Sequence, residues 1–327
     1  MKRICLIDAD SKIPNLALMK LSEYHKQIGD TVELIKAGLS YYPTRGKSMF
    51  EITKEYDTIY CSVVFNRNFE KVFGKNIIFG GTGSKDIGKV LSPEIEKLKP
   101  DYSIYPENTE SFGFVTRGCI RKCAFCIVPK KEGGIRKVNS LENIIKHKKV
   151  NFLDNNILAY PLHYGILNEL VERRVKCRFI QGLDIRLVNQ ENSNLLSKLK
   201  YLKEYTFAFD DLKYLNLIQE KLKILKWRYD WQLRFFVYCH PSMGIPNVLY
   251  RVKWLIDRKI LPYVMRHIEC WSSENHEFYT DLAAYINQPN IFKIYDFDEY
   301  LLERHNSINR IRRSMELYYG NSPHINI

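Results

Sequence analysis

The sequence has no long apolar segment, no internal repeat and no low-complexity stretch. None of its hydrophobic runs approaches the roughly 18 residues that would suggest a membrane span. Asp8 and Asp10 interrupt the apolar start of the chain, which argues against a signal peptide. With 327 residues, 45% of them hydrophobic, the chain is long enough to bury a core and to form about two domains. We therefore expect a globular cytoplasmic protein without a membrane partner.

Cysteine is also too sparse for a secreted disulfide scaffold, since the chain has only eight. Five cysteines are scattered, mostly in apolar runs, and we interpret them as small buried side chains in a reducing compartment. These five are Cys5, Cys61, Cys177, Cys239 and Cys270. The other three, Cys119, Cys123 and Cys126, crowd into one short segment. That segment carries the strongest chemical signal in the sequence.

Short β-branched runs alternate with helical stretches along the chain, which predicts an α/β fold with parallel strands. In the first hundred residues, strands are expected at residues 3–8, 31–35, 58–65, 76–79 and 102–105, and a helix at 15–28. This order predicts a Rossmann-like, doubly wound N-terminal domain over residues 1–108.

A second strand–helix series begins near residue 109. Strands are expected at 112–116, 150–154, 177–180, 206–209, 234–238 and 263–268, with helices at 140–149, 164–173, 192–199, 212–225 and 246–257. Six such units in succession predict a partial or full β/α (TIM-like) barrel over residues 109–290, and another open sheet is the alternative. Residues 291–327 are expected to form a basic helical C-terminal extension.

The three crowded cysteines have the spacing of a loop that binds a metal cluster. Cys119, Cys123 and Cys126 are separated by four and three residues and follow a predicted strand. Such a loop can give one thiolate to each of three irons of a cubane, which leaves the fourth iron open to a small molecule. A zinc site would take four nitrogen or sulfur donors in two separated pairs, whereas the nearest histidine is His147 and no second Cys-x-x-Cys pair exists. We therefore predict a 4Fe–4S cluster.

At these residues the sequence resembles the radical S-adenosylmethionine (SAM) superfamily. Its hallmark, Cys-x-x-x-Cys-x-aromatic-Cys, is matched by Cys119, Cys123, Phe125 and Cys126. The resemblance implies that SAM chelates the open iron, and that an electron from the cluster cleaves it to methionine and a 5′-deoxyadenosyl radical, which abstracts a substrate hydrogen. It also implies an electron donor such as flavodoxin or ferredoxin. Phe125 is expected to pack near the adenine.

The flanking sequence narrows this resemblance to members that carry an N-terminal cobalamin-binding-type Rossmann domain. Residues 116–119 and 126–129 resemble these branches and the methylthiotransferases, and residues 76–84 resemble the last strand and turn of such a domain. Gly80, Gly81 and Gly83 follow a predicted strand as a cofactor-cradling loop would, with a tight turn as the alternative. The Asp-x-His-x-x-Gly motif that supplies an axial histidine to cobalt is absent. Cobalamin therefore stays an open alternative.

Polar residues at the ends of predicted barrel strands are candidate SAM-binding groups, because barrel chemistry occurs at the C-terminal face. The resemblance implies that Asp154 and Asn156 meet the SAM amino group, although the usual Gly-Gly-Glu is missing. Arg186 is expected to pair with the SAM carboxylate, and Gln181 or Asp184 to bond the ribose hydroxyls. A helix cap or a solvated loop is the alternative for each.

Residues 117–149 carry ten Lys and Arg against two Glu, a net +8 of the chain's +13. A basic surface there favours an anionic substrate, an acidic electron donor or RNA, and a solvated face is the alternative. The predicted function is a radical SAM enzyme of unknown substrate, with a cobalamin-dependent methyltransferase among its subclasses. Two alternatives are a tRNA-modifying methylthiotransferase-like enzyme and a non-enzymatic nucleic-acid-binding protein whose triplet holds a structural metal.

Overall fold

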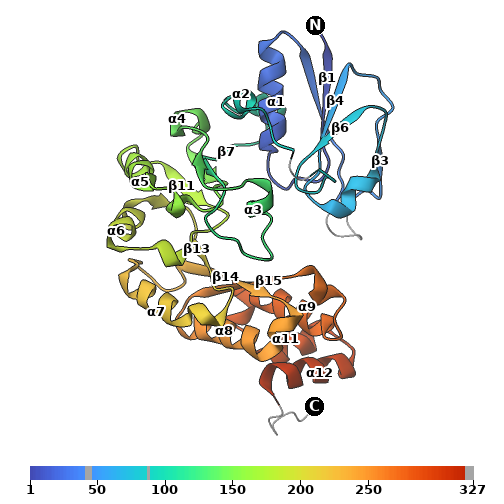
Figure 1. The fold of residues 1–327 in the computed structure, drawn as a ribbon. Helices are drawn as coiled ribbons and strands as arrows, with labels where there is room; N and C mark the ends of the chain where they lie inside the picture. The colour runs from blue at the N-terminus through green and yellow to red at the C-terminus, as the bar shows by residue number, and fades with distance from the viewer. Residues whose placement is uncertain (41–45, 87–88, 321–327) are drawn as a thin grey trace. The chain divides into compact units, whose positions relative to one another are not determined.

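The computed structural model describes residues 1–40, 46–86 and 89–320 (Figure 1). The chain divides into two compact units, of which the first holds Met1–Leu162 and Val175–Ile180 and the second holds His163–Arg174 and Gln181–Ile327. Both contain parallel strands with helices between them, so the predicted α/β class is confirmed. The three-part division into residues 1–108, 109–290 and 291–327 stays a prediction. In the described part of the chain, no helix has the length and apolarity needed to cross a membrane.

The first unit begins with a four-stranded parallel sheet in the order β2-β1-β4-β6. Its elements are β1 (Arg3–Asp8), α1 (Leu16–Gln27), β2 (Thr31–Lys36), β4 (Thr58–Ser62) and β6 (Ile77–Gly80). Alternate residues of β1 serve the two faces: Ile4 and Leu6 cluster with Leu18 of α1, whereas Cys5 and Ile7 belong to a separate core cluster. Figure 1 shows α1 beside this sheet. The four strands and the helix predicted here are confirmed, although the strand at 58–65 ends early.

The rest of the first unit contains short elements and a second set of parallel strands, in which β10 pairs with both β7 and β11. Its elements are β3 (Phe50–Glu51), η1 (Asn66–Lys71), β5 (Val72–Phe73), α2 (Pro93–Glu96), η2 (Tyr102–Ile104), β7 (Ser111–Gly113), β8 (Thr116–Arg117), α3 (Val128–Lys131), β9 (Arg136–Lys137), α4 (Leu141–Ile144), β10 (Lys149–Phe152), η3 (Ile157–Ala159) and β11 (Lys176–Phe179).

The strand predicted at 112–116 is divided in two, because β7 pairs in parallel with β10 whereas β8 pairs antiparallel with β9. Two other predicted elements of this region are wrong. Residues 102–105 form the 3-10 turn η2 instead of a strand, because the Asp101 carboxylate accepts the Ser103 N–H at 2.9 Å and caps the turn. The helix predicted at 140–149 is only the single turn α4. Its continuation is diverted because the N–H groups of Lys146 and His147 donate to the Ser111 hydroxyl oxygen at 2.9 and 2.8 Å. Tertiary hydrogen bonds thus override the local helical pattern.

The second unit is built on the parallel sheet β13-β14-β15. Its elements are α5 (His163–Glu172), η4 (Ile185–Leu187), α6 (Gln190–Lys198), β12 (Lys200–Tyr201), β13 (Tyr205–Ala208), η5 (Leu212–Tyr214), α7 (Leu215–Ile224), β14 (Leu233–Cys239), η6 (Pro241–Met243), α8 (Ile245–Asp257), β15 (Leu261–Arg266), η7 (Ile268–Trp271), α9 (His276–Ile286), α10 (Pro289–Phe292), α11 (Phe297–Arg304) and α12 (Ile308–Tyr319). Helix α8 packs on β14 and β15, and α9 packs on β15. The helices predicted between these strands are confirmed, and the predicted tail is helical at α11 and α12. Residues 321–327 of that tail lie outside the described residues.

Candidate functional site

The three crowded cysteines lie on one loop that follows β8. Cys119, Cys123 and Cys126 are half-buried, whereas the other five cysteines are buried. The loop begins at Gly118, whose φ is +89° and where a Cβ would lie 2.2 Å from the carbonyl oxygen of Gly134. Only glycine fits this close approach. Within the loop, the Cys126 N–H donates to the Cys123 carbonyl oxygen at 3.0 Å, which forms a tight turn between two of the thiols.

Two N–H groups point at the sulfur of Cys119. The backbone N–H of Arg121 and the side-chain amide of Asn156 each donate to Cys119 Sγ at 3.3 Å. Donors of this kind orient a cysteine sulfur that ligates a metal. Beside it, the Asn155 side chain accepts the Gly118 N–H at 2.9 Å. The structure therefore brings the predicted site residue Asn156 together with the cysteine loop.

Asp154 lies after the C-terminal end of β10 and is completely buried. Its carboxylate accepts the N–H groups of Val115 at 3.2 Å and Thr116 at 2.6 Å, and the Thr116 hydroxyl at 2.7 Å. Burial raises the pKa of Asp154 to about 6, and these donors act in the opposite direction. Thr116 is the first residue of β8, which leads into the cysteine loop. The Asp154 carboxylate therefore connects the strand before this loop to the segment that follows β10. Binding of the SAM amino group by Asp154 stays a prediction.

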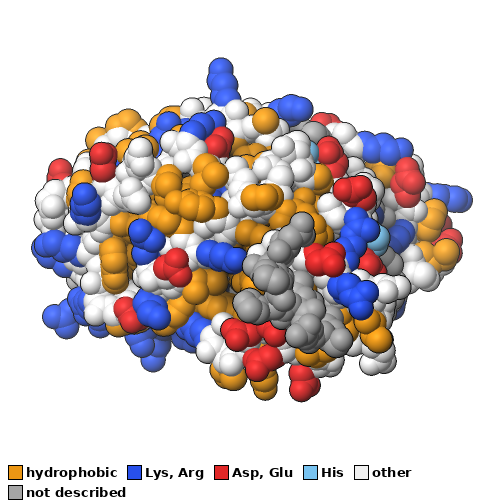
Figure 2. Space-filling view, turned by 90° about the horizontal axis from the view of Figure 1, so that it is seen from below, with side chains coloured by type: hydrophobic (Ala, Val, Ile, Leu, Met, Phe, Trp, Pro, Cys, Tyr) orange, Lys and Arg blue, Asp and Glu red, His pale blue; other side chains and the backbone are white. Residues whose placement is uncertain are grey.

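The basic stretch 117–149 is partly neutralised by ion pairs inside the first unit. Arg117 lies between two carboxylates, with its Nε 3.2 Å from Glu96 and a terminal nitrogen 3.0 Å from Glu132. Lys20, itself buried, also pairs with Glu96 at 2.9 Å. Figure 2 shows one face of the molecule, seen from below Figure 1, where Lys and Arg side chains are interspersed with apolar and acidic ones; it does not single out residues 117–149. The anionic or RNA partner predicted from this stretch stays a prediction.

Gly80 and Gly81 line a pocket of about 580 Å³ in the first unit. Gly81 has a φ of +94°, and a Cβ there would lie 2.2 Å from the Val63 carbonyl oxygen, while a Cβ on Gly83 would lie 2.6 Å from the backbone of Phe65. The tight turn named above as the alternative therefore accounts for Gly81 and Gly83. The cofactor-binding role of the three glycines stays a prediction. The pocket beside Gly80 is the place where such a cofactor would bind.

The remaining predicted residues are Phe125 in the first unit and Gln181, Asp184 and Arg186 in the second. Phe125 is 44% exposed on the cysteine loop. Gln181 is exposed in the second unit. Asp184 caps η4 and pairs with Arg186 through two contacts, Oδ1 with Nε at 2.6 Å and Oδ2 with a terminal nitrogen at 3.1 Å. This fork-to-carboxylate pair places the Arg186 guanidinium on a protein carboxylate. The SAM contacts predicted for these residues stay predictions.

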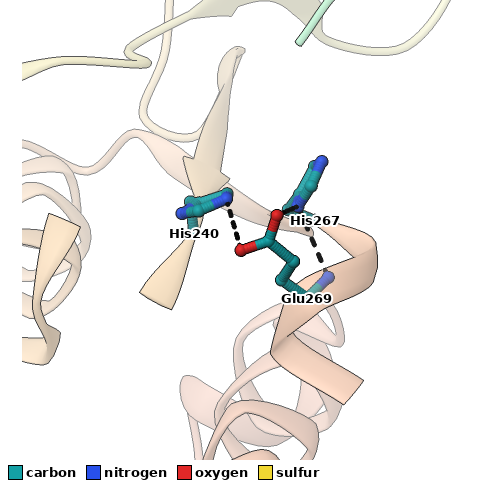
Figure 3. A group of neighbouring side chains, drawn as sticks. All are labelled: His240, His267 and Glu269. Carbon is teal, nitrogen blue, oxygen red and sulfur yellow. Dashed lines mark hydrogen bonds and ion pairs between the residues drawn. The ribbon is translucent and has the colours of Figure 1, made fainter. Parts of the chain in front are cut away.

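The structure also assembles a group that the sequence analysis missed. His240 directly follows β14 and His267 directly follows β15, and the carboxylate of Glu269 lies between the two imidazoles (Figure 3). The oxygens of Glu269 are 3.2 Å from His240 Nε2 and 3.9 Å from His267 Nδ1. The available signal was a histidine after each of two consecutive parallel strands. It was hidden because the predicted strand 263–268 extended past His267.

Two charged residues, Arg251 and Asp210, lie at the C-terminal ends of β13 and β14, next to the strand end that His240 follows. The Arg251 guanidinium is completely buried and donates to the carbonyl oxygens of Phe209 at 2.7 Å and Tyr238 at 2.9 Å. Asp210 follows β13, and burial raises its pKa to about 6 while the nearby Arg251 charge acts to lower it. A buried cation therefore ties together the ends of β13 and β14.

Comparison with known proteins gives no assignment: no family model matches the chain, and no curated protein shows significant sequence similarity to it.

Proposed function

We propose that this protein is a radical SAM enzyme, in which Cys119, Cys123 and Cys126 hold a 4Fe–4S cluster. The observation that carries this proposal is the set of three half-buried thiols, spaced by four and three residues on one anchored loop. When bound, the cluster supplies the electron that cleaves SAM and generates the 5′-deoxyadenosyl radical. An electron donor such as flavodoxin or ferredoxin would reduce it. The substrate remains to be identified.

The donor set favours a cluster over a single ion. A mononuclear site needs its ligand atoms close together, as in the group of His240, His267 and Glu269, whose ligand atoms lie within 4.8 Å of one another. Among the described residues, the three thiols do not form such a group. A cubane takes one thiolate on each of three separate irons, which matches a set of three cysteines. Iron and sulfide content, measured in the test below, separates the cluster from the alternative of a structural zinc ion.

The chain itself would position the cysteine sulfurs. The donors from Arg121 and Asn156 orient the sulfur of Cys119. The bonds from Thr116 to Asp154, together with the bond from Gly118 to Asn155, hold the start of the loop against the segment after β10. A loop fixed in this way loses less conformational freedom when it binds its cofactor.

We also infer the finer architecture that this function requires. The sheet order β2-β1-β4-β6 with α1 packed against it supports a Rossmann-like N-terminal domain. In each unit, strands consecutive within the second series are parallel neighbours, namely β7, β10 and β11 in the first and β13, β14 and β15 in the second. Consecutive parallel neighbours are what a β/α barrel over residues 109–290 requires.

The test is anaerobic reconstitution of Cys123→Ala beside the unsubstituted protein. The variant should lose the iron and sulfide of the cluster and release no 5′-deoxyadenosine from SAM, because one iron would lack its thiolate. Cys177→Ala is the matched control, since Cys177 is a buried cysteine of β11 in the same unit. It should keep iron, sulfide and SAM cleavage. Full iron content and undiminished deoxyadenosine release in Cys123→Ala would refute the proposal.

A further inference from the structure

The register of the second sheet brings two histidines together. Strands β14 and β15 are parallel, and Cys239 is paired with Arg266 at their C-terminal ends. The next residue on each strand is a histidine, so His240 and His267 begin neighbouring loops at one edge of the sheet. Their ring centres are 4.6 Å apart, with the rings tilted by 40°. Glu269 comes from the first turn of η7, directly after β15.

We propose that His240, His267 and Glu269 bind one divalent transition-metal ion. One ring nitrogen of each histidine and one carboxylate oxygen lie within 4.8 Å of one another. Two imidazoles and a carboxylate suit zinc and its neighbours, and such three-ligand sets leave coordination positions open for water or substrate. Ligand bonds of roughly 2.0–2.2 Å require the three side chains to close in only slightly around the ion.

The two histidine side chains are less exposed to solvent than Glu269, which suits a metal site that solvent can reach. The side chains of His240 and His267 are 18% and 30% exposed, whereas that of Glu269 is 60% exposed. The imidazoles are therefore held by the fold, and the carboxylate is free to adjust at the solvent side. An ion bound here would be reachable from solvent, and its open positions would accept an anionic group such as a carboxylate or phosphate.

Ser242 holds the ring nitrogen of His240 that faces away from the proposed ion. Its hydroxyl oxygen lies 2.8 Å from His240 Nδ1, and its backbone N–H donates to the same nitrogen at 3.1 Å. With Nδ1 accepting, the neutral ring carries its proton on Nε2. Binding of a metal by Nε2 moves this proton to Nδ1, where the Ser242 hydroxyl oxygen can accept it in place of the backbone contact, so that Ser242 orients the ring as outer partners of metal-bound histidines do.

Arg266, which directly precedes the proposed ligand His267, makes its contacts with other residues. Arg266 donates to the Thr280 hydroxyl at 2.7 Å, and its guanidinium lies 4.5 Å from the centre of the Trp271 ring. Cys239 and Cys270 flank the proposed ligands in sequence, but both are fully buried, with their sulfurs 4.0 Å apart. These two thiols therefore belong to the core. The Co²⁺ spectrum described below tests whether they bind the metal in place of the proposed ligands.

The experiment measures metal binding by the full-length chain. Zn²⁺ binding is followed by equilibrium dialysis, and Co²⁺ serves as the spectroscopic probe under anaerobic, reducing conditions. His240→Ala and His267→Ala should each lose one equivalent of Zn²⁺, with at least about a 100-fold weaker affinity at that site, and Ser242→Ala should weaken it by about 10-fold. Glu269→Gln keeps the side-chain shape and should also weaken binding. Circular dichroism establishes that each variant is folded.

Two controls separate this site from the cysteine loop. His276→Ala removes an exposed histidine at the start of α9 and should bind as the unsubstituted protein does. Cys123→Ala should keep the equivalent assigned to His240, His267 and Glu269, so this inference can stand or fall independently of the proposed cluster. Unchanged Zn²⁺ affinity in His240→Ala and His267→Ala would overturn it. So would an intense thiolate-to-Co²⁺ band for this equivalent that disappears in Cys270→Ala.

Discussion

Replacing Arg251 by methionine is expected to destabilise the second unit strongly. Arg251 is completely buried, and its guanidinium donates to the carbonyl oxygens of Phe209 and Tyr238 and to the side chain of Asn247, at 2.7, 2.9 and 2.9 Å. These bonds connect the ends of β13 and β14 to α8. Methionine keeps the apolar stem but removes every donor.

The size of this destabilisation follows from the buried groups that lose their hydrogen-bond donor in Arg251→Met. Each buried carbonyl that loses a charged donor costs about 1.5–3 kcal/mol, and Asp210 loses the cation that favours its ionised form. Removing the buried guanidinium also removes its desolvation cost, which offsets part of this loss. We expect a net loss of about 3–5 kcal/mol in the free energy of unfolding for Arg251→Met. Arg251→Lys should lose less, because it keeps the charge, although one ammonium cannot reproduce the planar fork.

Urea unfolding followed by circular dichroism measures this change, with separate transitions fitted if the two units unfold independently. Arg258→Met is the matched control, because Arg258 is an exposed arginine at the end of α8. It should change stability by less than about 1 kcal/mol. A loss below about 1 kcal/mol in Arg251→Met would show that the buried guanidinium does not hold the strand ends together.

Three further substitutions test the fold. Gly81→Ala should lose at least about 2 kcal/mol, because Gly81 has a φ of +94° and the new Cβ would lie 2.2 Å from the Val63 carbonyl oxygen. Gly165→Ala, in α5 with open space around its Cβ, should gain up to about 1 kcal/mol, and thermal unfolding that ranks these two variants the other way contradicts this explanation. Asp281→Asn should cost about 3 kcal/mol, because the buried carboxylate accepts two bonds from Arg310, at 3.0 and 2.7 Å. Faster hydrogen exchange in α12 is the expected readout, and unchanged exchange there would exclude this anchoring role.

The local pattern of the sequence was enough to predict most strands and helices. The strand predicted at residues 3–8 is β1, and the helix predicted at 15–28 is α1 with one residue fewer at each end. These segments are predictable because alternating or helically spaced apolar residues define their buried faces. Residues 102–105 are the contrary case. Their tyrosines suit a strand, but the carboxylate of Asp101 caps a 3-10 turn there.

The candidate sites also contain features that local sequence predicts and features that it does not. The cysteine triplet is visible in the sequence because its three members lie within eight residues, so local spacing alone brings the thiols together. The support for that loop is not visible, since Asp154 and Asn156 reach it from the end of β10, more than thirty residues later. Arg186 shows the limit of residue type as a guide, because its guanidinium is already paired with Asp184.

By itself, the sequence determined the alternation of strands and helices, the parallel α/β class that follows from it, and the cysteine loop with its spacing. Only the tertiary structure decided which distant side chains meet. His240 and His267 are 27 positions apart and become neighbours because β14 and β15 pair in a register that ends both strands at one edge. Register depends on the packing of whole strands against their helices, and no short segment of sequence contains that information.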